Sequence, residues 1–162
     1  MSVQSLTPEL VESLRESGRE VLETMCATTP KAVEAVTNES SDYSDEIIGL
    51  LGFTGTRGGT FLVRTSEAIA RLISARMLMM EPEELTDFAE IADGFGELVN
   101  MISGNFKNAW VAGGNHMDLS VPNVTHNGSV RINLEQSGSL TSSVCIKLDE
   151  GDIHVSVHFE AA

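Results

Sequence analysis

One segment, from Leu85 to Trp110, constrains the fold more than any other part of this 162-residue chain. Its large apolar residues recur at spacings of three and four, which is the period of one face of an α-helix. These residues are Phe88, Ile91, Phe95, Leu98, Val99, Ile102 and Phe106. The segment therefore predicts a long helix that turns this apolar stripe toward a core.

The polar residues of the same segment fall on the opposite side of that helix. With 100° per residue and Phe95 at zero, the apolar stripe stays within about 60° of zero. Four residues lie between roughly 140° and 200°: Asp93, Glu97, Asn100 and Gly104. Because Glu97 and Asn100 are three residues apart, their Cβ atoms lie about 5 to 6 Å apart, so both side chains can reach one small target. This outward carboxylate and carboxamide pair is the best clue to function.

Acidic residues on an outer helix face usually serve solubility alone. Here, however, Gly94, Gly96 and Gly104 each cost the helix about 1 kcal/mol relative to alanine. Asn100 is a weak helix former as well, with no evident capping task in the middle of a helix. These losses favour a docking role, in which the glycines leave the flanks of the polar face open to a partner.

The first half of the chain predicts two more helices and a hairpin. Pro8 opens an acidic amphipathic pattern, which predicts a helix from about residue 7 to 28. The runs 46–53 and 60–64 flank a glycine-rich turn and predict two antiparallel strands. A further helix, capped by Thr65 or Ser66, is expected to end before Pro82.

After Trp110 the sequence changes to short alternating runs that predict strands. These runs cover 117–121, 129–135, 141–149 and 152–160, with a last turn around Gly151. Two stretches are interpreted as irregular: a polar loop over 37–45 and an insertion-like turn at His126-Asn127-Gly128. Together the elements predict one α+β domain over residues 1–162, with helices packed on a mostly antiparallel sheet.

Composition excludes several classes of partner. Lysine and arginine number 10 against 24 acidic residues, and the formal charge of −14 repels nucleic acids and anionic lipid surfaces. The N-terminal residues lack the pattern of a signal peptide, and no apolar run is long enough to span a membrane. The two cysteines form no CxxC pair, which fits a reducing compartment. A cytoplasmic protein is expected.

Other chemistries find little support in the sequence. The glycine-rich turn before Thr60 lacks the GK[ST] ending of a nucleotide loop and leads into a strand, so a plain hairpin turn is favoured. Histidines 154 and 158 are four residues apart in a predicted strand, so their side chains would project from the same face. With His116, His126 and either cysteine they could surround a metal. Their spacing is not that of a dedicated site, so no metal site is predicted. No serine lies in a nucleophile motif.

The segment from Glu97 to Asn105 resembles the ExxN signature of the CheC, CheX and FliY phosphatases of bacterial chemotaxis. Asp93, four residues before the glutamate, and Pro122, which follows Asn100 after 21 intervening residues, also match that pattern. The order of helix, strand pair, helix, signature helix and strands is similar to a CheC/CheX-like fold from about residue 5 to 160. Only Asn100 has a glutamate three positions earlier, and a single motif resembles the CheX branch.

This resemblance implies an enzyme that removes phosphate from the aspartyl phosphate of a CheY-like receiver domain. Asn100 would orient the attacking water and Glu97 would contact the lysine of the receiver. Asp93, Gly96 and Gly104 would belong to the docking surface. The resemblance implies no cofactor of the chain's own, because the Mg²⁺ belongs to the receiver. It also implies a homodimer formed through sheet edges, which the strand-rich C-terminal third would supply.

Two alternatives stay open at the level of sequence. A protein of the same fold could bind receivers or a flagellar switch as an adaptor, without accelerating hydrolysis. An unrelated α+β dimer could carry the ExxN spacing by chance and bind no receiver.

Overall fold

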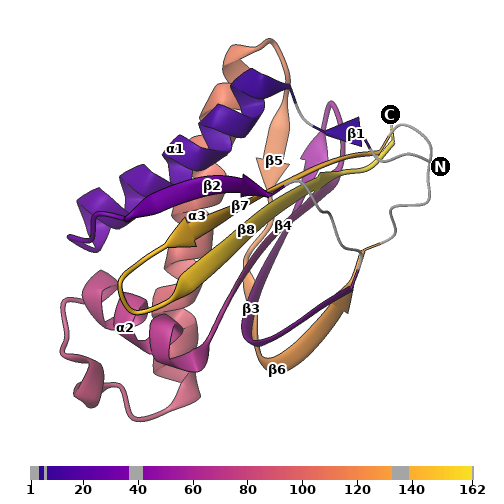
Figure 1. The fold of residues 1–162 in the computed structure, drawn as a ribbon. Coiled ribbons are helices and arrows are strands. Elements are labelled where there is room, and N and C mark those ends of the chain that lie inside the picture. The colour runs from indigo at the N-terminus through magenta and orange to yellow at the C-terminus, as the bar shows by residue number, and fades with distance from the viewer. Residues whose placement is uncertain (1–3, 6, 37–41, 133–138, 162) are drawn as a thin grey trace.

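Three helices cover one face of an eight-stranded sheet (Figure 1) in the part of the chain that the structure describes. The structure is a computed structural model that describes residues 4–5, 7–36, 42–132 and 139–161. The helices are α1 (Pro8–Met25), α2 (Glu67–Met77) and α3 (Phe88–Ala112), with a 3-10 turn, η1 (Pro82–Glu84), between the last two. Among them, none is both long and apolar enough to cross a membrane.

The sheet is antiparallel except for one short contact. Its strands are β1 (Gln4–Ser5), β2 (Ala32–Val36), β3 (Asp42–Gly55), β4 (Gly59–Thr65), β5 (Met117–Leu119), β6 (Asn123–Arg131), β7 (Leu140–Lys147) and β8 (Asp152–Phe159). They follow the order β1-β7-β8-β4-β3-β5, with β2 also paired to β7 and β6 to β3. Among the strands that the structure describes, only β1 runs parallel to its neighbour. The predicted α+β class, with helices on a mostly antiparallel sheet, is confirmed.

The helices begin where the sequence predicts. Thr7, Ser66 and Asp87 cap α1, α2 and α3, and each accepts a hydrogen bond from a backbone N–H in the first turn. At the other end, α1 stops at Met25 rather than near residue 28, since Ala27 adopts a positive φ of 49°. The apolar stripe of α3 is buried as predicted, from Ile91 to Trp110.

The glycine-rich turn joins β3 to β4 as a hairpin, which confirms the structural interpretation over a phosphate loop. Gly55 has a φ of +138°, and a Cβ at this position would lie 2.2 Å from the carbonyl oxygen of His116. Only glycine permits both that backbone conformation and that close approach. The contact with the chain that leads into β5 therefore explains the glycine at position 55.

Contact between α3 and the sheet depends on a second glycine. A Cβ on Gly49 of β3 would lie 2.6 Å from Cγ2 of Val99 and 3.2 Å from Cε2 of Phe95. The helix can therefore lie directly on the strand backbone at this point. Phe95 and Val99 are fully buried there, so the opposite side of α3 must face outward.

One end of the β3–β6 pair folds back over the sheet face that the helices do not cover. Thr60 pairs with both Gly52 and His158. Tyr43 precedes Gly52 by nine residues, which is about 30 Å in a straight strand. Yet the hydroxyl group of Tyr43 lies 3.2 Å from Nε2 of His158. The strand must therefore bend sharply.

The ladder of paired residues skips Glu46 and Asn127, between the pairs Asp45↔Gly128 and Ile47↔His126, and we place the bend there. Asn127 has a φ of +52° there, in the left-handed region that asparagine tolerates better than most residues. Tyr43 beyond the bend packs with Ile48 and Leu62 in a second, smaller apolar cluster. We call the segments 42–45 and 129–131 the folded ribbon.

Two predictions about this region are wrong. The expected polar loop over 37–45 contains the start of β3 from Asp42 onward, while residues 37–41 lie outside the described residues. The expected insertion-like turn at His126-Asn127-Gly128 is the middle of β6, which begins at Asn123 rather than Ser129. Polar composition misled both interpretations, because this ribbon presents much of its surface to solvent and needs few apolar residues.

The C-terminal third supplies sheet edges as expected, but only on one side of the sheet. Strand β8 lies between β7 and β4, and both β1 and β2 pair with the other edge of β7. The outer strands are β1 and β2 on one side, neither of which the sequence analysis predicted, and β5 and β6 on the other. Of the C-terminal strands, only β5 and β6 are therefore at an edge.

Candidate active site

The outward face of α3 carries the polar residues singled out in the sequence. Asp93, Glu97 and Asn100 are all exposed, whereas the neighbouring Phe95, Leu98 and Val99 are fully buried. The predicted geometry of the pair, on one outward face at a spacing of one helical turn, is therefore present. Among the described residues, Glu97 and Asn100 have no hydrogen-bond or ion-pair partner, so both side chains are available to another molecule.

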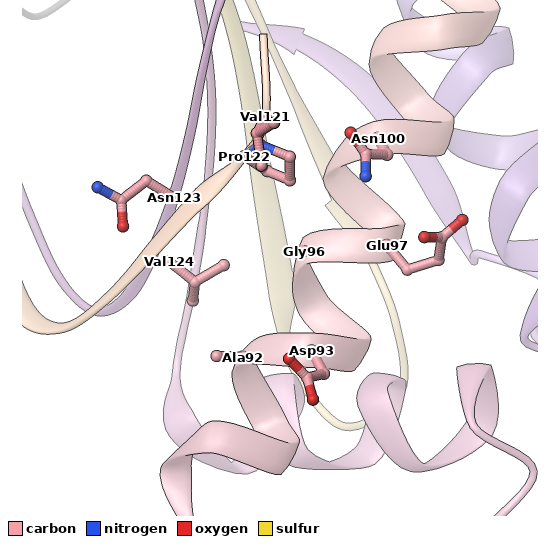
Figure 2. A pocket seen from close by; sticks show the side chains of 9 residues that line it. All are labelled: Ala92, Asp93, Gly96, Glu97, Asn100, Val121, Pro122, Asn123 and Val124. Carbon is pink, nitrogen blue, oxygen red and sulfur yellow. The ribbon is translucent and has the colours of Figure 1, made fainter.

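A groove of about 310 Å³ runs between this face and the segment that connects β5 to β6. Figure 2 shows its two walls: the helix on one side and the extended segment on the other. The groove is lined by Ala92, Asp93, Gly96, Glu97, Asn100, Val121, Pro122, Asn123 and Val124. Its volume fits one or two side chains of a partner rather than a large ligand, and it opens to solvent along the helix.

The second wall was largely missed in the sequence. Only Pro122 was noted, through a family resemblance, and its neighbours Val121, Asn123 and Val124 were not. Val121 is 85% exposed, an unusual position for a branched apolar side chain next to polar groups. A valine followed directly by proline, just before a predicted strand, is the local sequence signal that could have identified this wall. The apolar side chain of Val121 lines the groove on the wall opposite Asn100 (Figure 2).

The three glycines of α3 have different roles. Gly94 is buried, and a Cβ there would lie 2.5 Å from Cβ of Ser74 in α2, so this glycine permits close packing of two helices. The expectation that it opens the polar face is therefore wrong. Gly96 is buried beneath Pro122 and Val124, at ordinary contact distance for an added Cβ, and forms the floor of the groove. Gly104 has no neighbour within 4 Å of an added Cβ.

The histidines do not gather around one centre. His158 is buried, and its ring contacts the hydroxyl groups of Tyr43 and Thr141. His116 pairs with Asp118 (2.9 Å), and His126 lies 3.4 Å from Glu67 while stacking on Phe88. The prediction that His154 and His158 project from the same face of a strand is confirmed. Both lie in β8, four residues apart, and they pair with Arg64 and Thr60 of β4. His154 alone lies beside a cysteine, Cys145.

Comparisons with known proteins identify the fold and the family of this chain. The chain is 27% identical over 156 residues to the CheY-P phosphatase CheX of Thermotoga maritima, across 91% of this chain and 92% of that protein. Its fold is similar to the crystal structure of a chemotaxis protein CheX from Desulfovibrio desulfuricans, with a TM-score of 0.77, 22% identity and coverage of 94% and 99% of the two chains. It is also similar to CheX in a CheX–CheY–BeF3–Mg²⁺ complex from Borrelia burgdorferi.

That last likeness has a TM-score of 0.75 at 18% identity and covers 93% of this chain and 97% of that one. Both structural likenesses, at 22% and 18% identity, concern the fold alone. A family model described as chemotaxis phosphatase CheX matches residues 47–149, a stretch that includes α3 and the segment with Pro122. Because this match spans more than half of the 162 residues, the chain belongs to the CheX family of chemotaxis phosphatases.

Proposed function

We propose that this chain hydrolyses the aspartyl phosphate of a CheY-like receiver domain, with Asn100 and Glu97 as the residues that act on the partner. The observation that carries this proposal is the Glu97–Asn100 pair on the outward face of α3, exposed and without a partner among the described residues. Membership of the CheX family and the relative named as a CheY-P phosphatase support the same reaction.

The chemistry needs little from the phosphatase itself. Hydrolysis of an acyl phosphate requires a water molecule in line with phosphorus and the departing carboxylate oxygen. A carboxamide both donates and accepts hydrogen bonds, so Asn100 can hold such a water while its other atoms contact the phosphoryl group. It carries no charge that would oppose the phosphoryl oxygens. A carboxylate at position 100 would repel them.

Glu97 has a different task in this proposal. Its carboxylate, one turn before Asn100, would form a charge-assisted bond with the lysine of the receiver and so set the register of docking. Asp93, Gly96 and Gly104 would form the surrounding contact surface. The Mg²⁺ of the reaction would arrive with the receiver, as the CheX–CheY–BeF3–Mg²⁺ complex of a structural neighbour suggests.

The direct test is release of phosphate from a purified phosphorylated receiver, with and without this chain. Asn100→Ala should lower the stimulated rate by about 100-fold or more, the usual loss when one group that stabilises a transition state is removed. Asn108→Ala is a matched control, because Asn108 is also exposed on α3 but does not line the groove. A near-wild-type rate with Asn100→Ala would exclude the proposed role.

The same assay decides between an enzyme and an adaptor. An adaptor of this fold would bind the receiver and leave the lifetime of its phosphate unchanged. Binding without acceleration, with every receiver of the host, would therefore favour the alternative function. Membership of the family already argues against an unrelated α+β protein with a chance ExxN spacing.

We further propose that residues 1–162 act as a single domain in the cytoplasm and as a homodimer joined through sheet edges. Strand β6 supports the dimer, because it is an outer strand with much of its length exposed. Sedimentation at micromolar concentration should give about twice the 17.4 kDa mass of one chain. A species of 17.4 kDa would contradict the dimer without affecting the proposed reaction.

A further inference from the structure

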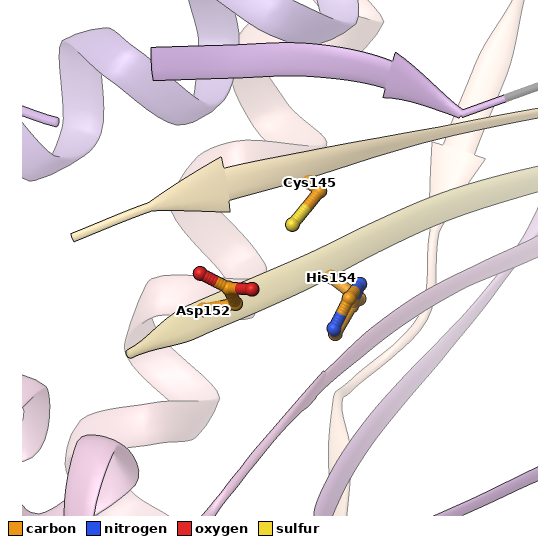
Figure 3. A group of neighbouring side chains, drawn as sticks. All are labelled: Cys145, Asp152 and His154. Carbon is orange, nitrogen blue, oxygen red and sulfur yellow. The ribbon is translucent and has the colours of Figure 1, made fainter. Parts of the chain in front are cut away.

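A group of three metal-ligating side chains lies on the sheet face that the helices leave uncovered. Cys145 of β7 pairs directly across the ladder with His154 of β8. Asp152 precedes His154 by two residues, so the side chains of Asp152 and His154 project from the same face. Figure 3 shows the three side chains near one another, Cys145 on β7 and Asp152 and His154 on β8. The sulfur, a carboxylate oxygen and a ring nitrogen all lie within 4.8 Å of one another.

The distances are close to those of a bound ion. Zinc binds thiolate, imidazole and carboxylate groups at about 2.0 to 2.3 Å, which puts tetrahedral ligand atoms roughly 3.3 to 3.8 Å apart. The three atoms would therefore need to approach one another by about 1 Å, a movement that side-chain rotation supplies. Cys145 is buried, His154 is half-buried and Asp152 is exposed, so an ion could enter from the solvent side.

The surrounding charges are compatible with a cation. Nζ of Lys147 lies 3.7 Å from Oδ2 of Asp152, but the two side chains are 40% and 42% exposed, and solvent-accessible pairs of this kind are weak enough for a divalent ion to displace. Arg64 pairs across the ladder with His154, yet its guanidinium group is already bound to Asp45 at 2.6 Å. On the other side, Glu34 of β2 lies directly opposite Cys145 and adds a flexible, exposed carboxylate.

We propose that Cys145, Asp152 and His154 bind a divalent cation of the zinc type, with Glu34 or water as the fourth ligand. All three ligand types belong to the set that tetrahedral zinc sites use. The site would link β7 to β8 on the side of the sheet opposite α3. It is separate from the Glu97–Asn100 groove and does not depend on the proposed phosphatase reaction.

Cobalt(II) is a suitable probe, because a thiolate bound to tetrahedral cobalt gives a near-ultraviolet charge-transfer band and strong visible bands. Titration of the full chain should produce both at one equivalent, and Zn²⁺ should remove them by competition. Cys145→Ser should abolish the charge-transfer band. Cys26→Ala is the matched control, since Cys26 is the other free, buried thiol and lies in the turn after α1. The control should keep the band.

Two further variants, at the exposed Asp152 and the half-buried Lys147, test the site without changing a buried side chain. Asp152→Asn should weaken cobalt binding by about 10-fold or more, because it removes a charged ligand. Lys147→Met should tighten binding severalfold, since it removes the ammonium group that competes for Asp152. Absence of a thiolate band in the wild-type chain, or its loss in Cys26→Ala but not in Cys145→Ser, would overturn the proposal.

Discussion

At the scale of single residues, Glu97 and Asn100 are both exposed and line the same groove, but they differ in electrostatic character. One is a fixed negative charge and the other a neutral dipole, on the same wall of one groove. A charge suits recognition of a cation, while a neutral donor and acceptor suits a water molecule next to an anion. The two side chains should therefore affect different kinetic parameters.

Replacing Glu97 by glutamine tests this division of roles. The change keeps size and hydrogen bonding but removes the charge, so KM for the phosphorylated receiver should rise by about 10-fold, the equivalent of roughly 1.4 kcal/mol. The value of kcat should change much less. Steady-state phosphate release over a range of receiver concentrations measures both. Glu23→Gln, an exposed position on α1, should change neither. A fall in kcat with an unchanged KM would assign Glu97 to the chemical step instead.

At the scale of elements, α3 is held by close contacts on two sides. It lies on Gly49 of β3 and packs against Ser74 of α2 through Gly94. Ser74 also donates a hydrogen bond of 2.7 Å to the carbonyl oxygen of Ile91. These contacts fix how α3 is rotated about its axis. The rotation in turn decides that the Glu97–Asn100 pair faces the Val121–Val124 segment.

Gly94→Ala and Gly104→Ala should therefore have opposite effects on stability. At position 94 the new methyl group meets backbone and side-chain atoms of Ser74 at 2.5 to 2.9 Å, and overpacking of this kind costs about 1 to 3 kcal/mol. At position 104 nothing lies within 4 Å, so alanine should stabilise the helix by about 0.5 to 1 kcal/mol. Denaturant unfolding of both variants measures the difference. Equal effects would contradict the close packing of α2 and α3.

At the scale of the whole molecule, the folded ribbon depends on a buried histidine. His158 is 3% exposed and lies beneath the ribbon, where it faces Tyr43, Thr141 and the cationic Arg64. Burial, and then the charge of Arg64, lowers the pKa of His158 to about 4. In the unfolded chain this histidine would titrate near its ordinary value of about 6.5. Between about pH 6.5 and pH 4, the folded chain therefore keeps His158 neutral while the unfolded chain protonates it.

Stability should consequently fall as the pH is lowered from about 6.5 to 4. In this window the unfolded chain binds a proton at His158 that the folded chain does not, and the contribution is up to about 3 kcal/mol. Above pH 6.5 this contribution is fully present. The variant His158→Gln should be less stable at pH 7 but lose less stability on acidification. Urea unfolding at pH 7 and pH 5 tests this, with the exposed His116→Gln as control. Parallel losses in both variants would assign the pH dependence to other groups.

The candidate site was predictable from sequence to the extent that it depends on one helix. A helical period is a local property, so the spacing of Phe95, Leu98 and Ile102 alone indicated that Glu97 and Asn100 would face outward. Caps, glycine turns and alternating runs are local as well, and they placed most helices and strands. Where polar composition replaced periodicity as the signal, as at Asn127, the interpretation was wrong.

Only the tertiary structure decided which distant segments became neighbours. Val121 lies opposite Asn100 across a groove, Tyr43 folds back onto His158, and Cys145 pairs with His154, although nothing local in the sequence links the members of each pair. Sheet order and the bend in β3 set these contacts, and both depend on the packing of the whole core. The sequence by itself determined the outward polar face of α3. Only folding decided that this face lies opposite the Val121–Val124 segment. Folding likewise brought Cys145, Asp152 and His154 together on the sheet face that the helices leave uncovered.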